Sequence, residues 1–372
     1  MILYSVVCVI AVALSYMTRR TSYQGSRQRA LNITCIAAIF ALLTSLAALR
    51  IEVGNDYGTY VVTCHEIFQH GYVVTEPGYN LVVRILYTLS GSENYLLMFG
   101  VFGAAIVAIF LKSMWDESDS FVLSMFLFMF LGLYFRSFNT VRYYFALAIT
   151  LFSLRYVVYV NYQNILKFIV LILVAATFHK SVLVVIPMYL ICRIPWKKWM
   201  YIVVTLLGIA VMCSGKYLMP LMLKLYPSYE GTVYADQVHS IFENAPIIAR
   251  CVLVLVLALC FYKDTICENE DNSLYFKMNI CAIILYICCY WMPLVTRFGY
   301  YLITSQILLV PNILCRIKDE RKRRIATICV VVVVLLYFVY FLLTGSREGI
   351  RVIPYKSWLF HSRYWLNQTD TF

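Results

Sequence analysis

The sequence predicts an all-α, polytopic integral membrane protein, and three properties of the chain lead to this fold class. Hydrophobic residues make up 62% of the 372 residues and charged residues only 13%, a composition that soluble globular domains do not approach. The mean hydropathy is +0.77. Apolar runs of about 16 to 20 residues, close to the length that a helix needs to cross a bilayer, recur along the whole chain. Because no segment between them is long enough for a soluble domain, we expect one transmembrane domain over residues 1–372.

The apolar runs predict about twelve transmembrane helices. The run at 181–192 is short for a span, and residues 79–90 have the pattern of an amphipathic helix lying at the membrane interface. Segments 50–94 and 216–245 are expected to be extracytoplasmic, and residues 345–372 to form an interfacial tail. The expected spans are 2–17, 31–49, 95–111, 120–135, 140–158, 164–178, 181–192, 199–214, 246–262, 274–291, 298–314 and 325–343.

Basic residues predict the orientation. They concentrate in 19–29 and 316–324, and such clusters mark cytoplasmic loops. Alternating spans then place both termini and most of the remaining polar segments outside.

The net charge of +12 does not indicate nucleic-acid binding, because the basic residues are scattered among short loops. The thirteen cysteines lie mostly in apolar runs without zinc-type spacing, and we interpret them as small core residues.

A turn after the second apolar run is the first candidate site. Arg50, Glu52 and Asp56 stand where that run ends, and Gly54 and Gly58 allow the chain to turn tightly there. Charges so close to a bilayer usually face a protein interior or a wet cavity. A carboxylate there can act as a general base, and an arginine can hold a phosphate by its planar fork. A plain loop, or an ion pair of Arg50 with one of the two acids, is the structural alternative.

Two other side chains are candidates for a catalytic base on the same side. Glu76 precedes a Pro-Gly turn, and His179 ends an apolar run just before Lys180. Histidine titrates near neutral pH and can serve as acid or base. A hydrogen-bonded packing role is the alternative for His179.

A basic motif overlaps the start of the fifth apolar run. Arg136, Asn139 and Arg142 follow one another at intervals of three residues, so in a helix they share one face. Three donors stacked at a helix opening suit a diphosphate. Two arginines that only anchor a helix end are the alternative.

Further candidates for substrate binding are aromatic or basic. Arg297 follows a proline at a membrane boundary, and Tyr300 and Tyr301 follow it, while Tyr57 stands beside Asp56. Aromatic rings pack on sugar faces and can donate a hydrogen bond. The 31 tyrosines of the chain therefore favour sugar handling over ion transport.

These residues together suit an enzyme that acts on a lipid-linked diphosphate. No dense carboxylate cluster is present, so we expect neither a cofactor nor an obligatory metal. Two alternatives stay open: a membrane acyltransferase using His179, and a flippase or transporter of lipid-linked glycans. A flippase should show inverted repeats and charges near the midplane, whereas the charges here gather at one boundary.

Six motifs, in order along the chain, resemble those of the EpsG family of bacterial exopolysaccharide and capsule polymerases. They are R-x-x-x-G-N-D-Y from Arg50, E-P-G-Y from Glu76, N-x-x-R-x-x-x-A-x-A from Asn139, F-H-K-S from Phe178, R-F-x-x-Y from Arg297 and I-P-Y-x-S-W from Ile353.

The resemblance implies a Wzy-like glycosyltransferase with a fold akin to GT-C enzymes. Such an enzyme joins repeat units carried on undecaprenyl diphosphate at the outer face of the bacterial cytoplasmic membrane. Donor and acceptor would both be lipid-linked, and a flippase and a chain-length regulator would be candidate partner proteins. By this analogy the functional positions are Arg50, Asp56, Glu76, Arg142, His179 and Arg297.

Overall fold

The computed structural model describes residues 1–19, 25–159, 161–225, 240–292, 295–347 and 349–360, and these residues are helical with no named strand among them. They divide into two compact units. Unit 1 comprises Met1–Phe152, Leu173–Lys180 and Arg324–Phe372, and unit 2 comprises Ser153–Ile172 and Ser181–Arg323. The expectation of one transmembrane domain therefore stays a prediction.

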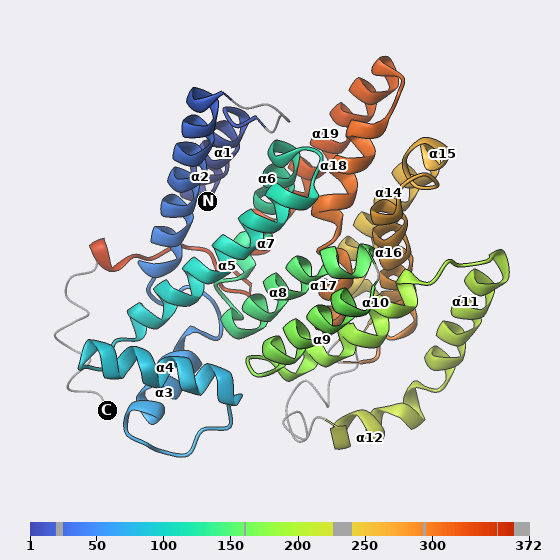
Figure 1. Cartoon of the computed structure of the whole chain (residues 1–372). Helices are drawn as coiled ribbons and strands as arrows, with labels where there is room; N and C mark the ends of the chain where they lie inside the picture. Colours follow the sequence, from blue (N-terminus) through green and yellow to red (C-terminus); the bar gives the residue numbers. More distant parts are fainter. Residues whose placement is uncertain (20–24, 160, 226–239, 293–294, 348, 361–372) are drawn as a thin grey trace. The chain divides into compact units, whose positions relative to one another are not determined.

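Unit 1 contains the N-terminal helices and the last long helix. In Figure 1, α1 and α2 lie side by side, α5 packs on α2, and the short pair α3 and α4 lies at one end of these helices. Helix α8 continues into unit 2, α9 enters unit 1 at Leu173, and α19 enters it at Arg324. The helices are α1 (Ile2–Tyr16), α2 (Ser26–Ala48), α3 (Tyr57–Phe68), α4 (Pro77–Ser90), α5 (Tyr95–Glu117), α6 (Phe121–Phe130), α7 (Leu133–Arg136), α8 (Val141–Val158), α9 (Tyr162–Ala176) and α19 (Glu320–Thr344), with the 3-10 turn η4 (Trp358–Phe360).

Unit 2 is built around α16, which packs against α10, α11, α14, α17 and α18. Its elements are η1 (Lys180–Val184), α10 (Val185–Arg193), α11 (Lys198–Cys213), α12 (Gly215–Leu225), η3 (Ile241–Asn244), α14 (Ala245–Cys260), α15 (Tyr262–Thr265), α16 (Glu270–Cys288), α17 (Val295–Ile303) and α18 (Gln306–Arg316).

The prediction of a helical membrane protein is confirmed, but the count of about twelve crossings is not. Each predicted span contains helix within the described residues. In the part of the chain that the structure describes, six helical segments are long and apolar enough to cross a membrane by themselves, and a bent pair, α11 with α12, would make a seventh. Helices such as α1 and α9 are shorter, with 15 residues each. A GT-C-like arrangement likewise stays a prediction.

Local sequence explains where several helices begin and end. The side chain of Asn94 accepts a hydrogen bond from Leu97 N (2.9 Å) and caps α5, and Ser120 caps α6 in the same way. Gly132, with φ +72°, separates α6 from α7, and Phe341 occupies the space that a β-carbon would need. Only glycine fits both constraints, so this break between helices is fixed by one residue.

The predicted amphipathic segment 79–90 is helix α4. Tyr79, Val83 and Tyr87 recur every four residues and are buried against the protein, whereas Leu81 and Leu89 on the other side are exposed. Exposed leucines on a helix of this kind fit an interfacial position.

The described part of the C-terminal tail packs on the segment that follows α2. Backbone hydrogen bonds run from Ile51 N to Lys356 O (3.0 Å), from Gly54 N to Arg351 O (2.9 Å) and from Trp358 N to Leu49 O (3.1 Å). The predicted interfacial tail is therefore, up to residue 360, an ordered partner of residues 49–55. Residues 361–372, and residues 226–239 within the predicted segment 216–245, lie outside the described residues.

Candidate functional site

The turn at 52–56 is shaped by a glycine and by two distant segments. Gly54 has φ +102°, and the backbone of Phe138 and Asn139 fills the position of a β-carbon there. A larger residue at this position would therefore both strain and displace the backbone. Asp56 follows as the N-cap residue of α3, but its carboxylate makes no capping hydrogen bond.

Asn139 holds this turn against the C-terminal segment. Its Oδ1 accepts a hydrogen bond from Asp56 N (3.0 Å), and its Nδ2 donates to Gly349 O (2.9 Å). Both ends of the amide are thus engaged with backbone groups that are 83 and 210 residues away along the chain. This places Asn139 where it fixes the position of Asp56.

Arg50 lies in an aromatic interior. Its side chain is 2% exposed, its guanidinium carbon lies 4.3 Å from the centre of the Phe99 ring and 5.0 Å from that of Phe138, and Nη1 donates to Ala47 O. Burial lowers the pKa of Arg50 to about 10, which leaves it charged at neutral pH, and cation–π contacts stabilise that charge. The ion pair considered for Arg50 with Glu52 or Asp56 does not form among the described residues: Arg50 donates to Ala47 O, and Glu52 pairs with Lys356 (2.6 Å).

Glu76 and Arg142 form an ion pair, although 66 residues separate them. The second oxygen of Glu76 accepts a hydrogen bond from Lys180 N (3.2 Å), which brings the end of the α9 segment to the same place. Gly78 N donates to Thr177 O (2.8 Å), and the close approach of Thr177 leaves no room for a side chain at Gly78. The E-P-G-Y motif thus positions its carboxylate by packing its glycine directly on residues 177–180.

Arg142 uses only part of its hydrogen-bonding capacity. Its Nη1 donates to Glu76. Its guanidinium carbon lies 5.8 Å from the centre of the Tyr60 ring and 5.3 Å from that of Tyr79. Its Nε is buried and has no hydrogen-bond partner among the described residues. Because Arg142 stands in the first turn of α8, the positive end of the helix dipole acts against its charge, and the ion pair with Glu76 compensates for this. A site of this kind favours an additional anion.

Tyr60 connects Asp56 with Arg142. Its hydroxyl accepts a hydrogen bond from Arg142 N (3.2 Å), and it lies in the electrostatic fields of both charged side chains. Burial raises the pKa of Tyr60 and, likewise, that of Tyr57, so both phenols stay protonated at neutral pH. Sequence reasoning missed Tyr60, for which position i+4 from Asp56 was the available signal.

His179 and Arg136 lie on the borders of this group. The His179 ring makes an edge-on contact with Tyr143 (5.3 Å between ring centres), and the next residue, Lys180, is bonded to Glu76. Arg136 lies over the Phe341 ring at 5.4 Å. We call Asp56, Glu76, Asn139, Arg142 and His179 the Asp56–Arg142 cluster. Its members come from three helix N-termini and the loop after α9, all within unit 1.

The remaining predicted residues belong to unit 2, where they lie on α17. Tyr301 is fully buried and its hydroxyl is 2.9 Å from Ser181 Oγ, while Tyr300 is 7% exposed and Arg297 is half-buried. Tyr301 therefore packs in the interior of unit 2. The structure gathers Arg297, Tyr300 and Tyr301 on one helix but gives no geometry that joins them to the Asp56–Arg142 cluster.

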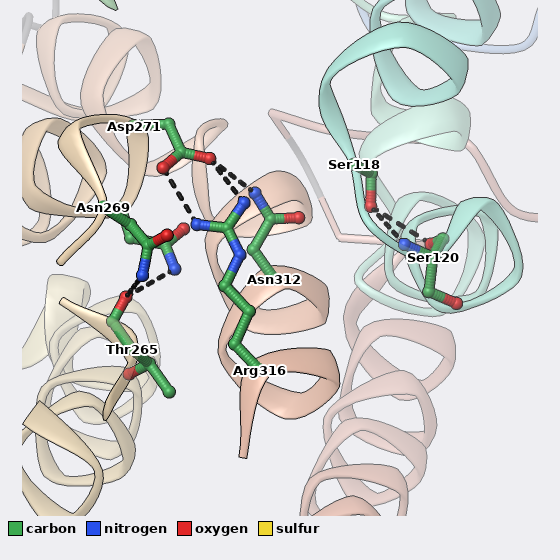
Figure 2. A network of polar contacts seen from close by, with 8 residues as sticks. Ser118, Ser120, Thr265, Asn269, Asp271, Asn312 and Arg316 are labelled. Carbon is green, nitrogen blue, oxygen red and sulfur yellow. Dashed lines mark hydrogen bonds and ion pairs between the residues drawn. The ribbon is translucent and has the colours of Figure 1, made fainter. Parts of the chain in front are cut away.

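A second polar group in unit 2 was not predicted. Arg316 binds Asp271 through both Nη atoms (2.9 and 2.8 Å), and Asn312 donates to the same carboxylate (Figure 2). Further along the same helices, Gln306 donates to Asn279 Oδ1 (2.7 Å). We call these five residues the Asp271–Arg316 network. Its members lie on the apolar helices α16 and α18, and the periodicity of the sequence does not indicate which polar side chains of two such helices contact each other.

Fold and site together define a helical membrane protein with an anion-favouring polar cluster beside helices that are able to cross a bilayer. The sequence model of the EpsG family matches residues 33–357, which include both the turn at 52–56 and most of the C-terminal segment paired with it. The chain belongs to the EpsG family, and this membership indicates an exopolysaccharide-related polymerase role. Comparison with curated proteins and with solved structures finds no match.

Proposed function

We propose that this protein is a Wzy-like polymerase that joins undecaprenyl-diphosphate-linked oligosaccharide repeat units at the outer face of the cytoplasmic membrane. The observation that carries the proposal is the convergence of Asp56, Glu76 and Arg142 at the N-termini of α3, α4 and α8. Helix N-termini favour anions, and Arg142 has a donor to spare. A diphosphate leaving group fits this electrostatic environment.

In the proposed reaction, a sugar hydroxyl of the incoming lipid-linked unit attacks the anomeric carbon of the growing glycan. The new glycosidic bond forms as the bond between that carbon and the diphosphate oxygen breaks, and the hydroxyl proton passes to Asp56. Undecaprenyl diphosphate leaves with the bonding electron pair. Arg142, assisted by Arg136, stabilises the charge that develops on the leaving oxygen.

The other residues have supporting roles in this scheme. Glu76 orients Arg142 through their ion pair, so its carboxylate is less suited to be the base than that of Asp56. Asn139 positions Asp56, and buried Arg50 holds the preceding turn from inside. The predicted sugar- and diphosphate-binding residues also include Tyr57 and, in unit 2, Arg297, Tyr300 and Tyr301. His179 is the alternative base.

Transport of lipid-linked glycans is the competing function, and the Asp271–Arg316 network bears on it. Gln306 and Arg316 are ten residues apart on α18, so the Asp271–Arg316 network extends about 15 Å along the helix, roughly half of a hydrocarbon core. Both of its charged members, Asp271 and Arg316, are ion-paired. A charged path through the membrane is therefore not supported by the residues that the structure describes.

Incubation of the purified protein in nanodiscs with a defined lipid-linked repeat unit tests the proposal. We expect a ladder of glycans that grows by whole repeat units, together with release of undecaprenyl diphosphate. An acyl donor supplied to a parallel sample should give no acylated glycan. Absence of a ladder, with acyl transfer or with movement of the lipid-linked unit across a vesicle membrane instead, would contradict the proposal.

A further inference from the structure

Two arginines of the C-terminal segment that pairs with the turn at 52–56, Arg347 and Arg351, have no assigned role. Both are exposed, and among the described residues, which omit position 348, neither side chain makes a hydrogen bond or ion pair. Arg351 O accepts the hydrogen bond from Gly54 N (2.9 Å), which places Arg351 opposite a residue only two positions before Asp56. Two cations are thus held at the edge of the Asp56–Arg142 cluster.

The backbone of Arg351 has a conformation that is unusual for arginine. Its φ is +44°, a left-handed conformation that glycine adopts easily and that disfavours residues with a β-carbon. Hydrogen bonds on both sides, from Arg351 N to Arg347 O (3.1 Å) and from Gly54 N to Arg351 O, hold it there. An arginine in a position that suits glycine is explained if the guanidinium has a function.

The other arginines of unit 1 near this site contact protein groups through at least part of their side chains. Arg142 is ion-paired with Glu76, and Arg50 is enclosed by aromatic rings. Arg347 and Arg351 follow α19 on the side that the basic clusters predict to be external, where arginines run against the usual bias and need an anionic partner. The bond between Arg351 N and Arg347 O closes a single turn, so both guanidinium groups belong to one short stretch of surface.

We propose that Arg351, together with Arg347, binds the phosphate groups of the polyprenyl diphosphate substrate at the entrance to the Asp56–Arg142 cluster. This assignment rests on the proposed polymerase function. A guanidinium binds phosphate by a bidentate fork, and two of them suit the two phosphates of the carrier. The site would hold the carrier while Arg142 acts on the oxygen that leaves.

The experiment measures binding of undecaprenyl diphosphate to the full-length protein in nanodiscs of zwitterionic lipid. Arg351→Gly removes the cation and relieves the backbone, so it should keep or raise the thermal stability yet weaken binding at least about tenfold, the effect of losing one charge-assisted hydrogen bond. Arg351→Lys, which keeps charge without the fork, should lie between. His70→Gly is the matched control, since His70 has φ +58° and is exposed at the end of α3; it should bind as the unmodified protein does.

The outcomes distinguish the assignment of Arg351 from the polymerase function on which it rests. Unchanged binding in Arg351→Gly, with binding intact in the unmodified protein, would overturn the Arg351 assignment and leave the polymerase proposal in place. No binding by the unmodified protein would overturn both. Inorganic pyrophosphate and vesicles of phosphatidylglycerol are the comparison ligands. Pyrophosphate presents the same diphosphate group, so its affinity should fall together with that of the carrier. An equal loss of affinity for phosphatidylglycerol would overturn the assignment to the carrier and indicate a general headgroup site instead.

Discussion

The Asp56–Arg142 cluster of unit 1 and the Asp271–Arg316 network of unit 2 both contain an arginine–carboxylate pair, but the two pairs differ in how completely they are satisfied. Arg316 uses both Nη atoms on Asp271, whereas Arg142 uses one on Glu76 and leaves Nε without an acceptor among the described residues. The exposed fractions of the four side chains are similar, between 13% and 24%. Hydrogen bonding, and not burial, therefore distinguishes the two pairs.

Helix dipoles reinforce the difference. Asp271 lies in the first turn of α16 and Arg316 in the last turn of α18, where each charge is favoured by about 0.3 to 1 kcal/mol. Arg142 lies in the first turn of α8, where a cation is disfavoured. A fully bonded pair placed with the helix dipoles stabilises the fold, and a partly bonded cation placed against the dipole suits an anionic ligand. The Asp271–Arg316 network is therefore expected to act in stability and the Asp56–Arg142 cluster in function.

The largest effect is expected at Asp56. Asp56→Asn keeps the size of the side chain and the backbone bond to Asn139, but an amide cannot accept the proton, so turnover should fall by about 10²- to 10⁴-fold while the lipid-linked unit still binds. Turnover and binding are measured on the same purified sample. Glu66→Gln, at an exposed acid on the same helix, should behave as the unmodified protein. An active Asp56→Asn beside an inert His179→Gln would transfer the role of base to His179.

A large effect on stability, without one on chemistry, is expected in the Asp271–Arg316 network. Arg316→Ala leaves Asp271 without its main partner and should cost about 3 kcal/mol of unfolding free energy, near the lower end for buried pairs because both side chains are about a quarter exposed. Thermal unfolding in detergent reports this loss. Replacing the pair together, by Asp271→Asn with Arg316→Met, should recover part of the stability. If turnover per folded molecule fell tenfold in either variant, the purely structural role of the network would be wrong.

A smaller effect is expected at Asn139, which belongs to the site but acts through the backbone. Asn139→Ala removes two hydrogen bonds and should cost about 1 to 3 kcal/mol in stability, together with a severalfold loss of turnover as Asp56 loses its support. Asn94→Ala removes a helix cap at similar cost and provides the control. Equal turnover of the two variants per folded molecule would show that Asn139 does not position Asp56.

The comparison also shows what the sequence was able to predict. Helices followed from apolar runs, and the amphipathic pattern of 79–90 correctly predicted the helix α4, because both depend on local periodicity. The pairing of residues 49–55 with the C-terminal segment did not follow, since irregular segments carry no period that indicates a partner. The ion pair of Glu76 with Arg142 joins residues 66 positions apart, so sequence placed them on one side of the membrane without pairing them.

Tyrosine content was a weaker guide. Several tyrosines interpreted as a sign of sugar binding are buried residues that link helices through their hydroxyls. Tyr134 donates to Leu43 O (2.5 Å), and Tyr189 donates to Tyr301 O (2.6 Å). A buried hydroxyl must find an acceptor, and in an apolar helical protein a backbone carbonyl provides one. An excess of tyrosine in such a chain therefore reflects helix packing as well as function.

Exchange of the two charges of the Glu76–Arg142 pair, followed by the polymerisation assay, tests whether Arg142 holds the diphosphate or only anchors a helix. If the pair only anchors α4 to α8, the protein with both Glu76→Arg and Arg142→Glu regains the ion pair and, with it, activity. If Arg142 holds the diphosphate, the exchange restores thermal stability relative to the single variants, but glycan elongation stays at least about tenfold below that of the unmodified protein. The account predicts a stable, inactive double variant. A double variant that builds long chains at the unmodified rate would contradict it.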